Sequence, residues 1–462
     1  MTRGIVGAAA YLPHRRLDRS TIAAVAGGGG GTGTRTVAGY DEDTTTMGVE
    51  AARAALAPLP DLAPHTLWFS TVAPAYADKT NATAIHAALR LGSDAGAFDA
   101  NGSVRSAMGA LHAALGGRGS HLVVSADLRS GLAGGPDESA FGDGAAAVAI
   151  GDEGDAPVLA ELIGGGWATE EFLDRWREPG DTRSKVWEER FGETRYVPLG
   201  QAAWDDALKT AGLVADQIDL VAIAGTHGRA NAALAKKLAV GDRLAVDLAG
   251  SVGNLGAAQP AFVLTGALET ARPGQVIALV VLADGAHVLL FRTTDALAAW
   301  SPAHPVAEQV AAGAPIAYGT YLRWRGVLPA EPPRRPEPAR PSASASARSS
   351  DWKFGFVGST GDDGTVHLPP QPDDTTATPM ADVTGTIVTF TVDRLAYSPS
   401  PPVVFAVVDF DGGGRLPVEL TDLDVAQVRI GARVELTFRK LFTADGVHNY
   451  FWKARLAHGG DG

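Results

Sequence analysis

The residue type most often used for covalent chemistry is missing from this chain of 462 residues. It contains no cysteine, which excludes disulfides, thiolate zinc sites and cysteine nucleophiles together. Residues 27–33 form a glycine-rich run that resembles a phosphate-binding loop in composition. A phosphate loop needs a following Lys-Ser/Thr pair, and none is present. We therefore expect a flexible loop there, and any chemistry must come from oxygen and nitrogen side chains.

The composition excludes several classes of function. Apolar residues make up 45% and charged residues 20%, as in globular proteins, and the net charge is −13. A nucleic-acid-binding protein would carry a basic surplus, so no nucleic acid is expected as a partner. The longest apolar run, residues 276–290, is interrupted by Asp284 and His287 and is shorter than the roughly 20 residues that span a bilayer. No secretory signal is recognisable, so we expect a cytoplasmic protein with no membrane attachment.

The first 325 residues or so alternate between two patterns. Strand-like runs occur at residues 121–125, 219–224 and 276–281, and alanine-rich helical stretches occur at 47–56, 106–115 and 202–211. Strands alternating with helices predict a layered α/β domain. Residues 329–350 follow, rich in Pro, Ala, Arg and Ser without apolar periodicity, and predict an extended linker.

The C-terminal region, residues 351–462, is dominated by strand patterns. These patterns lie at residues 383–395, 403–409, 416–420 and 434–441, with turn sequences at 411–414 and 445–446. Several short strands in about 80 residues predict a small barrel.

Four motifs occur in order along the first region. They are Gly-Tyr-Asp-Glu-Asp-Thr-Thr-Thr-Met at residues 39–47, Pro-Ala-Tyr-Ala-Asp-Lys-Thr-Asn-Ala-Thr at 74–83, Phe-Gly-Asp-Gly-Ala-Ala at 141–146, and Ser-Val-Gly-Asn-Leu-Gly-Ala at 251–257. Together they resemble prokaryotic 3-hydroxy-3-methylglutaryl-CoA synthases and, more distantly, ketoacyl synthases. The resemblance implies a five-layered αβαβα thiolase-like domain, with an N-terminal half at residues 1–155 and a C-terminal half at 156–328.

The resemblance also implies a nucleophile that this chain does not have. Such enzymes attack an acyl thioester with a cysteine at the start of a buried helix, where the helix N-terminus favours the thiolate. Counting along the matching helix puts Val104 at that position. Ser103 is one residue away and is a weak candidate for a replacement nucleophile. The family's acid/base glutamate falls on Val72, so that role is lost as well.

The family's histidine falls on Ala224 by ungapped counting, and His227 lies three residues further on. A local shift could bring His227 into the pocket, and the alternative is an ordinary loop histidine. Asn254 stands where the family has its active-site asparagine. It could polarise a thioester carbonyl, or it could hold the loop backbone. Asp284 follows the strand at 276–282, where it could be a base or, as we favour, the cap of a turn.

The C-terminal region resembles the OB-fold proteins that act with thiolases on acyl-CoA. The matching text is Trp-Lys-Phe-Gly-Phe-Val-Gly-Ser at residues 352–359, Gly-Thr-Val-His-Leu-Pro-Pro at 364–370, Val-Thr-Gly-Thr-Ile-Val at 383–388, and Arg-Ile-Gly at 429–431. That family carries a zinc ribbon with two Cys-x-x-Cys pairs. Here the first pair falls on Thr360 and Asp363 and the second within residues 372–376. We therefore expect a degenerate ribbon without zinc, because His367 alone cannot build a site.

Two functions remain open. In the first, the protein acts on an acyl-CoA or acyl-carrier thioester without a covalent intermediate, by acyl transfer or by aldolase-like formation or cleavage of a C–C bond, in lipid or natural-product metabolism. In the second, it is a non-catalytic scaffold that docks on an active thiolase or ketosynthase. We favour the first slightly, because polar Asn254, Asp284 and His287 suggest a pocket that is not filled in.

Two structural predictions accompany these functions. We expect a homodimer that pairs along the strand at 121–125 as a sheet edge. We also expect the loops at Asn254, Asp284 and His227 to converge with the start of the helix at Val104 on one cavity floor. Valines at 72 and 104 would make that floor apolar, and the resulting desolvation would raise the pKa of Asp284.

Overall fold

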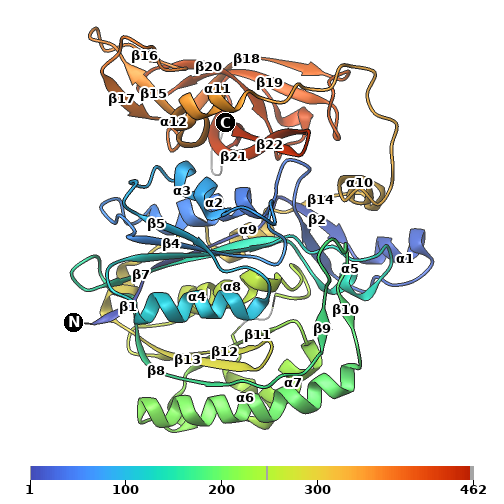
Figure 1. Cartoon of the computed structure of the whole chain (residues 1–462), viewed down its shortest axis with the longest axis vertical. Coiled ribbons are helices and arrows are strands. Elements are labelled where there is room, and N and C mark those ends of the chain that lie inside the picture. Colours follow the sequence, from blue (N-terminus) through green and yellow to red (C-terminus); the bar gives the residue numbers. More distant parts are fainter. Residues whose placement is uncertain (1, 246–247, 458–462) are drawn as a thin grey trace. The chain divides into compact units, whose positions relative to one another are not determined.

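The computed structural model in Figure 1 describes residues 2–245 and 248–457. It divides into two compact units. Unit 1 comprises Met1–Ala38, Glu50–Thr83 and Gly92–Tyr318, and unit 2 comprises Gly39–Val49, Ala84–Leu91 and Gly319–Gly462. Unit 2 therefore contains two short segments from the early part of the chain in addition to the C-terminal region.

The elements up to residue 324 alternate as predicted. In chain order they are β1 (Arg3–Tyr11), β2 (Arg15–Asp18), α1 (Ser20–Ala26), β3 (Thr34–Val37), α2 (Thr44–Leu56), β4 (Thr66–Ser70), α3 (Ala82–Ala88), β5 (Gly96–Asp99), α4 (Val104–Gly116), β6 (His121–Asp127), α5 (Pro136–Ala140), β7 (Gly144–Asp152), β8 (Ala160–Ala168), β9 (Arg175–Trp176), β10 (Lys185–Val186), α6 (Glu189–Ala211), β11 (Leu220–Gly225), α7 (Gly228–Lys237), α8 (Gln259–Thr270), β12 (Val276–Leu282), β13 (Ala286–Thr293), α9 (Val306–Ala311), β14 (Ala314–Pro315) and α10 (Tyr318–Trp324).

The sheet of unit 1 has nine strands in the order β11-β12-β13-β8-β1-β7-β6-β4-β5. Its two halves are joined only where Gly4 and Ile5 of β1 pair with β8. Figure 1 shows the halves stacked with α4 and α8 between them and with α6 and α7 outside one of them. The predicted layered α/β architecture is confirmed.

Helices α4 and α8 are central because both are apolar on the sides that face the strands. Helix α4 buries residues at intervals of three and four, namely Val104, Ala107, Met108, Ala110, Leu111, Ala114 and Leu115. This spacing gives one continuous apolar stripe. The stripe shares a core cluster with Phe262 and Leu264 of α8 and with residues of β1, β7 and β12. The start of α4 is therefore fixed by packing against both halves of the sheet.

The predicted edge strand at residues 121–125 is wrong. These residues belong to strand β6, which lies inside the sheet between β7 and β4. Strand β4 pairs in parallel with residues 121–125, so no backbone edge is left open there. The edge on this side of the sheet is β5, which leads directly into the segment before α4. Its Phe98 is half exposed.

Residues 329–342 form no helix or strand, as expected of a linker, but residues 343–348 of the predicted linker form helix α11 (Ala343–Arg348). The remaining elements are α12 (Ser350–Gly355), β15 (Val357–Thr360), β16 (Val366–His367), β17 (Thr376–Pro379), β18 (Gly385–Asp393), β19 (Val403–Phe410), β20 (Arg415–Leu420), β21 (Arg433–Ala444) and β22 (Val447–Leu456). Residues 458–462, the end of the last predicted domain, lie outside the described residues.

The predicted small barrel is confirmed. Strands β18, β19, β20, β22 and β21 close into it, and β16, β15 and β17 form a separate three-stranded sheet. The core of the barrel includes Ile387, Val408, Phe438 and Trp452, which are almost fully buried. The turns at 411–414 and 445–446 join β19 to β20 and β21 to β22, as the sequence predicted.

Unit 2 also contains a buried cluster of paired charges around the segment 40–43. Lys453 of β22 lies 2.9 Å from a carboxylate oxygen of Asp41 and also pairs with Glu419. Arg439 of β21 pairs with Glu42. The side chains of Lys453 and Arg439 are 0% exposed.

Hydroxyl groups complete this cluster. The hydroxyl of Tyr450 donates to Asp43 at 2.8 Å, and that of Thr421 donates to Asp41 at 2.9 Å. Arg439 also pairs with Asp422, at 2.5 Å. Each of the three consecutive carboxylates at 41–43 therefore has a barrel partner.

Candidate functional site

A cavity of 460 Å³ opens at the start of α4 in unit 1. Val104 is the first residue of the helix, and its side chain lines this cavity. Val72 lines the same cavity from the loop after β4, as does Ser103. Val72 and Val104, the positions onto which motif counting placed the family's glutamate and cysteine, thus lie at one site.

Asp127, at the end of β6, positions the loop of Val72. One of its carboxylate oxygens accepts the backbone N–H of Val72 at 2.8 Å and the hydroxyl of Thr71 at 3.0 Å. The other accepts the N–H of Ala257 at 2.7 Å. This buried carboxylate therefore ties the cavity wall to the loop that carries Asn254.

Ser103 occupies the N-cap position of α4 with extended backbone, and its side chain makes no capping hydrogen bond. It lines the cavity beside Val104. Among the described residues, no basic side chain hydrogen-bonds the Ser103 hydroxyl. The geometry therefore gives Ser103 none of the activation that a serine nucleophile requires.

Asp284 lies in the tight turn between β12 and β13, in the left-handed region at φ 46°. Its side chain lines the cavity but is exposed, unlike the buried carboxylate that the sequence led us to expect. Its carbonyl accepts from Arg105 of α4, and its N–H donates to the Tyr196 hydroxyl at 3.3 Å. Because the side chain is solvated, the desolvation argued from the valine floor does not apply to it.

Asn254 does not line this cavity in the described structure. Its Nδ2 donates to the carbonyl of Gly225 at 2.9 Å, and its Oδ1 accepts the N–H of Gly256 at 2.9 Å. The backbone of this loop pairs with Phe141 and Gly142, where a Cβ on Gly253 would lie 2.6 Å from Phe141. This geometry favours the loop-bonding alternative for Asn254.

His227 is the N-cap of α7, and both of its ring nitrogens bond the backbone. Nδ1 accepts the N–H of Ala230 at 3.1 Å, and Nε2 lies 2.8 Å from the carbonyl of Glu189. A neutral imidazole has one donor and one acceptor, so this arrangement uses both. His227 borders a neighbouring cavity rather than the one at Val104, and its neighbour Thr226 borders both.

Asp174 and Tyr196 were not singled out from the sequence, yet they are the most unusual polar pair at the site. Tyr196 of α6 is 3% exposed and lines the cavity at Val104. Its hydroxyl oxygen accepts the N–H of Asp284 at 3.3 Å, and the nearby carboxyl group of Asp174 is 6% exposed. Oδ1 of Asp174 has no hydrogen-bond partner among residues 2–245 and 248–457. Burial raises the pKa of Asp174.

Helix α6 makes room for this pair with a glycine. A Cβ on Gly192 would lie 2.6 Å from Oδ1 of Asp174 and 2.8 Å from the His227 ring. Carbon atoms in proteins do not approach polar atoms so closely, so any side chain at Gly192 would displace Asp174 or His227. The close packing around Asp174 therefore depends on this position.

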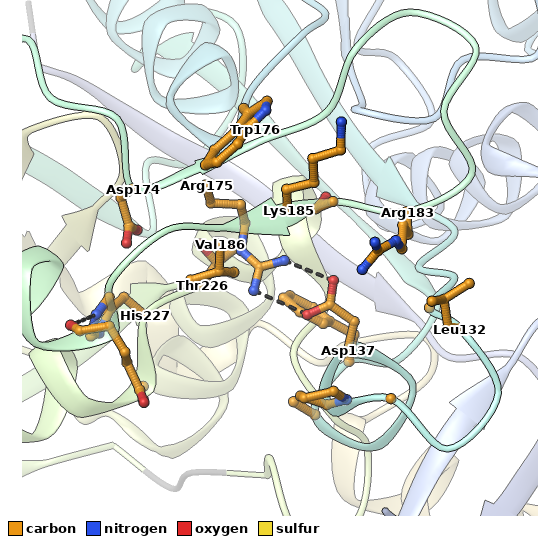
Figure 2. Close-up of a pocket in the computed structure, with 18 of the residues that line it drawn as sticks. Leu132, Asp137, Asp174, Arg175, Trp176, Arg183, Lys185, Val186, Thr226 and His227 are labelled. Carbon is orange, nitrogen blue, oxygen red and sulfur yellow. Dashed lines mark hydrogen bonds and ion pairs between the residues drawn. The ribbon is translucent and has the colours of Figure 1, made fainter. Parts of the chain in front are cut away.

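The neighbouring cavity, shown in Figure 2, has a volume of 950 Å³ and lies beside Asp174 and His227. Arg175 reaches across it to form two hydrogen bonds with Asp137, at 2.8 and 3.0 Å. Its lining combines apolar and cationic side chains, including Leu132, Phe141, Trp176, Val186, Arg183, Lys185 and Arg229. Arg175, Trp176, Ser184 and Thr226 line both cavities, so the two adjoin.

His287 lies in neither cavity. Its ring packs 5.6 Å from His112 and 5.8 Å from Trp167, and its Nε2 is buried without a partner among the described residues. Burial, with His112 and Arg105 nearby, lowers the pKa of His287 to about 4. His287 is therefore neutral at physiological pH and belongs to the packing of β13 rather than to the pocket.

The sequence is similar to curated proteins of one kind over most of its N-terminal region. The hydroxymethylglutaryl-CoA synthase of Pyrococcus furiosus is 28% identical over 293 residues, which are 61% of this chain and 83% of that protein. The synthase of Aeropyrum pernix is 29% identical over 347 residues, 70% of this chain and 94% of that protein. The N-terminal region is therefore similar in sequence to the hydroxymethylglutaryl-CoA synthases.

Solved structures show that this region has the thiolase-like fold. A hydroxymethylglutaryl-CoA synthase complexed with CoA matches 70% of this chain and 90% of its own length, with a TM-score of 0.58 and 16% identity. The 3-oxoacyl-[acyl-carrier-protein] synthase III of Aquifex aeolicus matches 63% of this chain and 99% of its own, with a TM-score of 0.53 and 21% identity. OleA of Xanthomonas campestris matches with a TM-score of 0.54 and 18% identity over 63% of this chain and 98% of its own.

The C-terminal unit has a different relative. Residues 377–439 match the family model of the C-terminal OB-fold domain of ChsH2. These residues include β18, β19, β20 and the first part of β21. The predicted resemblance of the barrel to an OB-fold is thus confirmed.

Hydrogen bonds hold the segment where the sequence predicted a degenerate zinc ribbon, residues 357–379. Asp374 lies where the second cysteine pair would fall, and it accepts the Ser359 hydroxyl at 2.5 Å and bonds Nδ1 of His367 at 2.7 Å. Thr360, at the first pair, bonds the Thr378 hydroxyl at 2.6 Å. The described residues contain no group of three or more His, Cys, Asp or Glu arranged to hold a metal ion. Nor do they contain a helix long and apolar enough to cross a membrane.

Proposed function

We propose that this protein binds an acyl-CoA or acyl-carrier thioester in the two adjoining cavities. We further propose that it acts on the thioester without a covalent acyl-enzyme. The observation that carries this proposal is that Val104, the first residue of α4, lines an open cavity. Motif counting puts the family's nucleophile at this position. A cavity that has lost its nucleophile but retains polar groups suits non-covalent chemistry on a bound thioester.

The lining of the larger cavity supports a thioester with a phosphorylated carrier. An acyl-CoA or acyl-carrier arm combines apolar and anionic parts. Apolar Leu132 and Val186 lie beside cationic Arg183 and Lys185 in this cavity. The smaller cavity adjoins it and contains Val72 and Val104, which suit the acyl end. The similarity to two hydroxymethylglutaryl-CoA synthases also supports an acyl-CoA as the substrate class.

Two reaction types are open to such a site. In direct acyl transfer, an acceptor attacks the thioester carbonyl and expels the carrier thiolate. In retro-aldol cleavage of a 3-hydroxyacyl thioester, a base removes the hydroxyl proton and the C2–C3 bond breaks. The bonding electrons then pass to the thioester as an enolate, whose oxygen needs a hydrogen-bond donor. Exposed Asp284 at the cavity can supply the base.

Restoring a thiol tests the proposed position of the missing nucleophile. Because the chain has no cysteine, Val104→Cys introduces a single thiol at a helix N-terminus. We expect intact mass spectrometry with acetyl-CoA and acetoacetyl-CoA to show an acyl adduct on this variant and none on the wild type. Ser103→Cys, one residue away, is the matched control and should acylate far less. A stable adduct on wild-type Ser103 would overturn the non-covalent proposal.

A scaffold that docks on an active thiolase or ketosynthase is the second candidate. It is favoured by Asn254 and His227, whose side chains are engaged by the backbone rather than offered to a ligand. Calorimetry with acetyl-CoA separates the two candidates. Saturable binding that Val104→Trp abolishes supports the enzyme, and no binding of CoA or acetyl-CoA supports the scaffold.

A homodimer remains part of the proposal, with β5 in place of the strand first expected. Strand β5 leaves one edge of its backbone unpaired in the described sheet, and Phe98 on it is half exposed. Light scattering at micromolar concentration should give twice the monomer mass. Phe98→Lys should shift the protein to the monomer, whereas a wild-type monomer would contradict this proposal.

We also propose that the ribbon segment folds without zinc. Hydrogen bonds of Asp374 with Ser359 and His367 supply the cross-links that thiolate–zinc bonds would provide. Metal analysis of protein purified without added metal should find far less than one zinc per chain. Stoichiometric zinc that resists chelators would contradict this.

A further inference from the structure

A cavity in unit 2 has no part in the proposed function. It has a volume of 850 Å³ and lies between residues 323–335, which run from the end of α10 into the linker, and residues 394–401 of the loop between β18 and β19. We propose that this cavity, which we call the arginine cavity, binds a phosphorylated small molecule of nucleotide size. The proposal does not rest on thioester binding in unit 1, because every residue that lines the arginine cavity belongs to unit 2.

Four arginines give the arginine cavity its charge. The lining includes Arg323, Arg334, Arg335 and Arg394, and Glu331 is the only acidic residue among the described residues that line it. In the part of the chain that the structure describes, none of the four guanidinium groups forms an ion pair. Guanidinium groups suit phosphate, because their planar N–H donors match its oxygens in pairs. Four unpaired cations around one hollow therefore favour a phosphorylated anion.

The sequence concentrates positive charge in this segment against the trend of the chain. Residues 323–348 contain six arginines and two acidic residues, whereas the whole chain has 52 acidic and 39 basic residues. A chain with a net charge of −13 repels anions over most of its surface. A basic hollow on such a chain therefore concentrates an anionic ligand locally.

Prolines and a buried serine shape the walls of the arginine cavity. Pro332, Pro333 and Pro399 line it, and the fixed φ of proline reduces the backbone freedom that a bound ligand would otherwise remove. Ser398 also lines it and is only 6% exposed. The Oγ of Ser398 accepts the N–H of Ser400 at 3.1 Å, and its hydroxyl proton has no acceptor among the described residues. This proton is a buried donor that a phosphate oxygen can accept.

The apolar part of the lining favours a ligand that is more than phosphate alone. Leu328, Leu395 and Tyr397 line the same cavity, and the two leucines are 45% and 66% exposed. Covering such side chains with the flat base of a nucleotide removes apolar surface from water. The volume of the cavity also lies in the usual range for small-molecule sites. A concave site of this size suits a nucleotide better than the flat acidic surface of a protein.

Isothermal titration calorimetry of the full chain with ADP tests the inference, with adenosine as the matched ligand that lacks phosphates. We expect saturable ADP binding that weakens as the salt concentration rises, and far weaker binding of adenosine. Arg334→Gln and Arg394→Gln should each weaken ADP binding by about ten- to hundredfold, the range for one charge-assisted hydrogen bond. Both positions are exposed, so these variants should fold as the wild type does.

Two control variants locate the site. Arg340 is an exposed arginine of the same linker that does not line the cavity, so Arg340→Gln should bind ADP as the wild type does. Arg183→Gln removes a cation from the larger cavity of unit 1 and should also leave ADP binding unchanged. Titration with adenosine 3′,5′-bisphosphate identifies the source of the nucleotide. Tighter binding than that of ADP indicates the nucleotide end of CoA, and equal or weaker binding indicates a free nucleotide.

Three results would overturn the inference. They are no binding of either nucleotide, ADP binding unchanged in both Arg334→Gln and Arg394→Gln, and a loss in Arg340→Gln as large as theirs, which would show non-specific attraction. Failure of acetyl-CoA to bind while ADP still binds would overturn the proposed function alone.

Discussion

Buried charges are arranged in opposite ways at two places in this chain. In unit 2, the carboxylates of Asp41, Glu42 and Asp43 meet Lys453, Arg439 and Tyr450. In unit 1, Asp174 lies beside the cavity with one carboxyl oxygen that has no partner among the described residues. At both places burial favours the neutral form of the carboxyl group and so raises its pKa. Asp41 nevertheless has a lowered pKa, because Lys453 and Arg439 compensate, whereas the pKa of Asp174 is raised.

The difference separates a structural use of charge from a functional one. A buried pair with full hydrogen bonding fixes the position of two segments, although a pair of apolar residues could be as stable. A buried polar group without a partner costs stability and gives no fixed geometry in return. Unpaired groups of that kind are concentrated at functional sites. The contrast therefore points to Asp174 as the group to test for function. The paired charges around residues 41–43 are explained by their partners.

The largest effect is expected from breaking the paired cluster. Lys453→Met leaves Asp41 and Glu419 buried without their cation, and loss of one partner of a buried pair costs about 3–5 kcal/mol. Urea unfolding of the purified chain should show this loss. Arg415→Met is the control, because its ion pair with Asp409 is exposed, and its unfolding midpoint should stay within error of wild type. Equal midpoints for the two variants would remove the distinction drawn here.

Asp41 and Lys453 of the paired cluster should contribute to stability over a broad pH range. Asp41 has a folded pKa below its ordinary value, so its contribution is present at neutral pH and is lost as the pH falls through that folded pKa. Lys453 has a raised folded pKa, because Asp41, Tyr40 and Glu419 outweigh its burial. Its contribution is complete below the ordinary lysine value and is lost only as the pH rises through the folded value.

His287 should produce the next largest effect, through acid sensitivity. Its folded pKa of about 4 lies below the ordinary 6.5, so the unfolded chain binds a proton that the folded chain does not. Stability should therefore fall by up to about 3 kcal/mol as the pH is lowered from 7 to 4. His287→Gln should flatten that part of the curve relative to wild type. Parallel curves for the two proteins would show that burial of His287 has no such effect.

Asp174 should behave in the opposite sense to Asp41. With a raised folded pKa, the folded chain holds a proton that the unfolded chain has released, so stability falls as the pH rises from about 4 through the folded pKa. Asp174→Asn should then be more stable than wild type at pH 8, by about 0.5–2 kcal/mol, and the difference should shrink towards pH 4. A variant less stable than wild type at pH 8 would show that Asp174 has a structural partner.

The smallest effect is expected at the cavity floor. Val104→Ala enlarges a cavity that already exists, so it should cost about 1 kcal/mol of stability, below the usual loss for a fully enclosed side chain. It should not change acetyl-CoA chemistry, because valine cannot react. A Val104→Ala protein that loses acetyl-CoA binding would indicate that this side chain shapes the ligand pose.

The sequence predicted those parts of the fold and site that depend on local pattern. The strands of both units follow from their apolar spacing, and Val72 and Val104 were located by counting within motifs. The edge strand was wrong because strand order depends on long-range pairing, which periodicity does not encode. His227 and Asn254 could be placed only to within a loop, and their bonding partners decide whether they face the cavity.

Asp174 and Tyr196 gave no sequence signal for a related reason. Asp174 precedes the two-residue strand β9 in an irregular segment, and Tyr196 occupies an ordinary apolar position of α6. Only the folded chain shows that Asp174 packs against Gly192 and that Tyr196 lines the cavity at Val104. The acidic run at 41–43 was visible as a motif, but its cations could not be inferred from it.

The paired cluster also has a consequence for synthesis of the chain. Tyr40 and Lys453 are 413 residues apart, and Lys453 lies near the end of the described chain. At about 5–20 residues per second, a ribosome needs roughly 20–80 s between them. During that time the nascent acidic run has no cation from the barrel and must stay hydrated. Closure of unit 2 therefore cannot begin until β21 and β22 have been synthesised, and a chain stopped before β21 would leave this acidic run without its barrel partners.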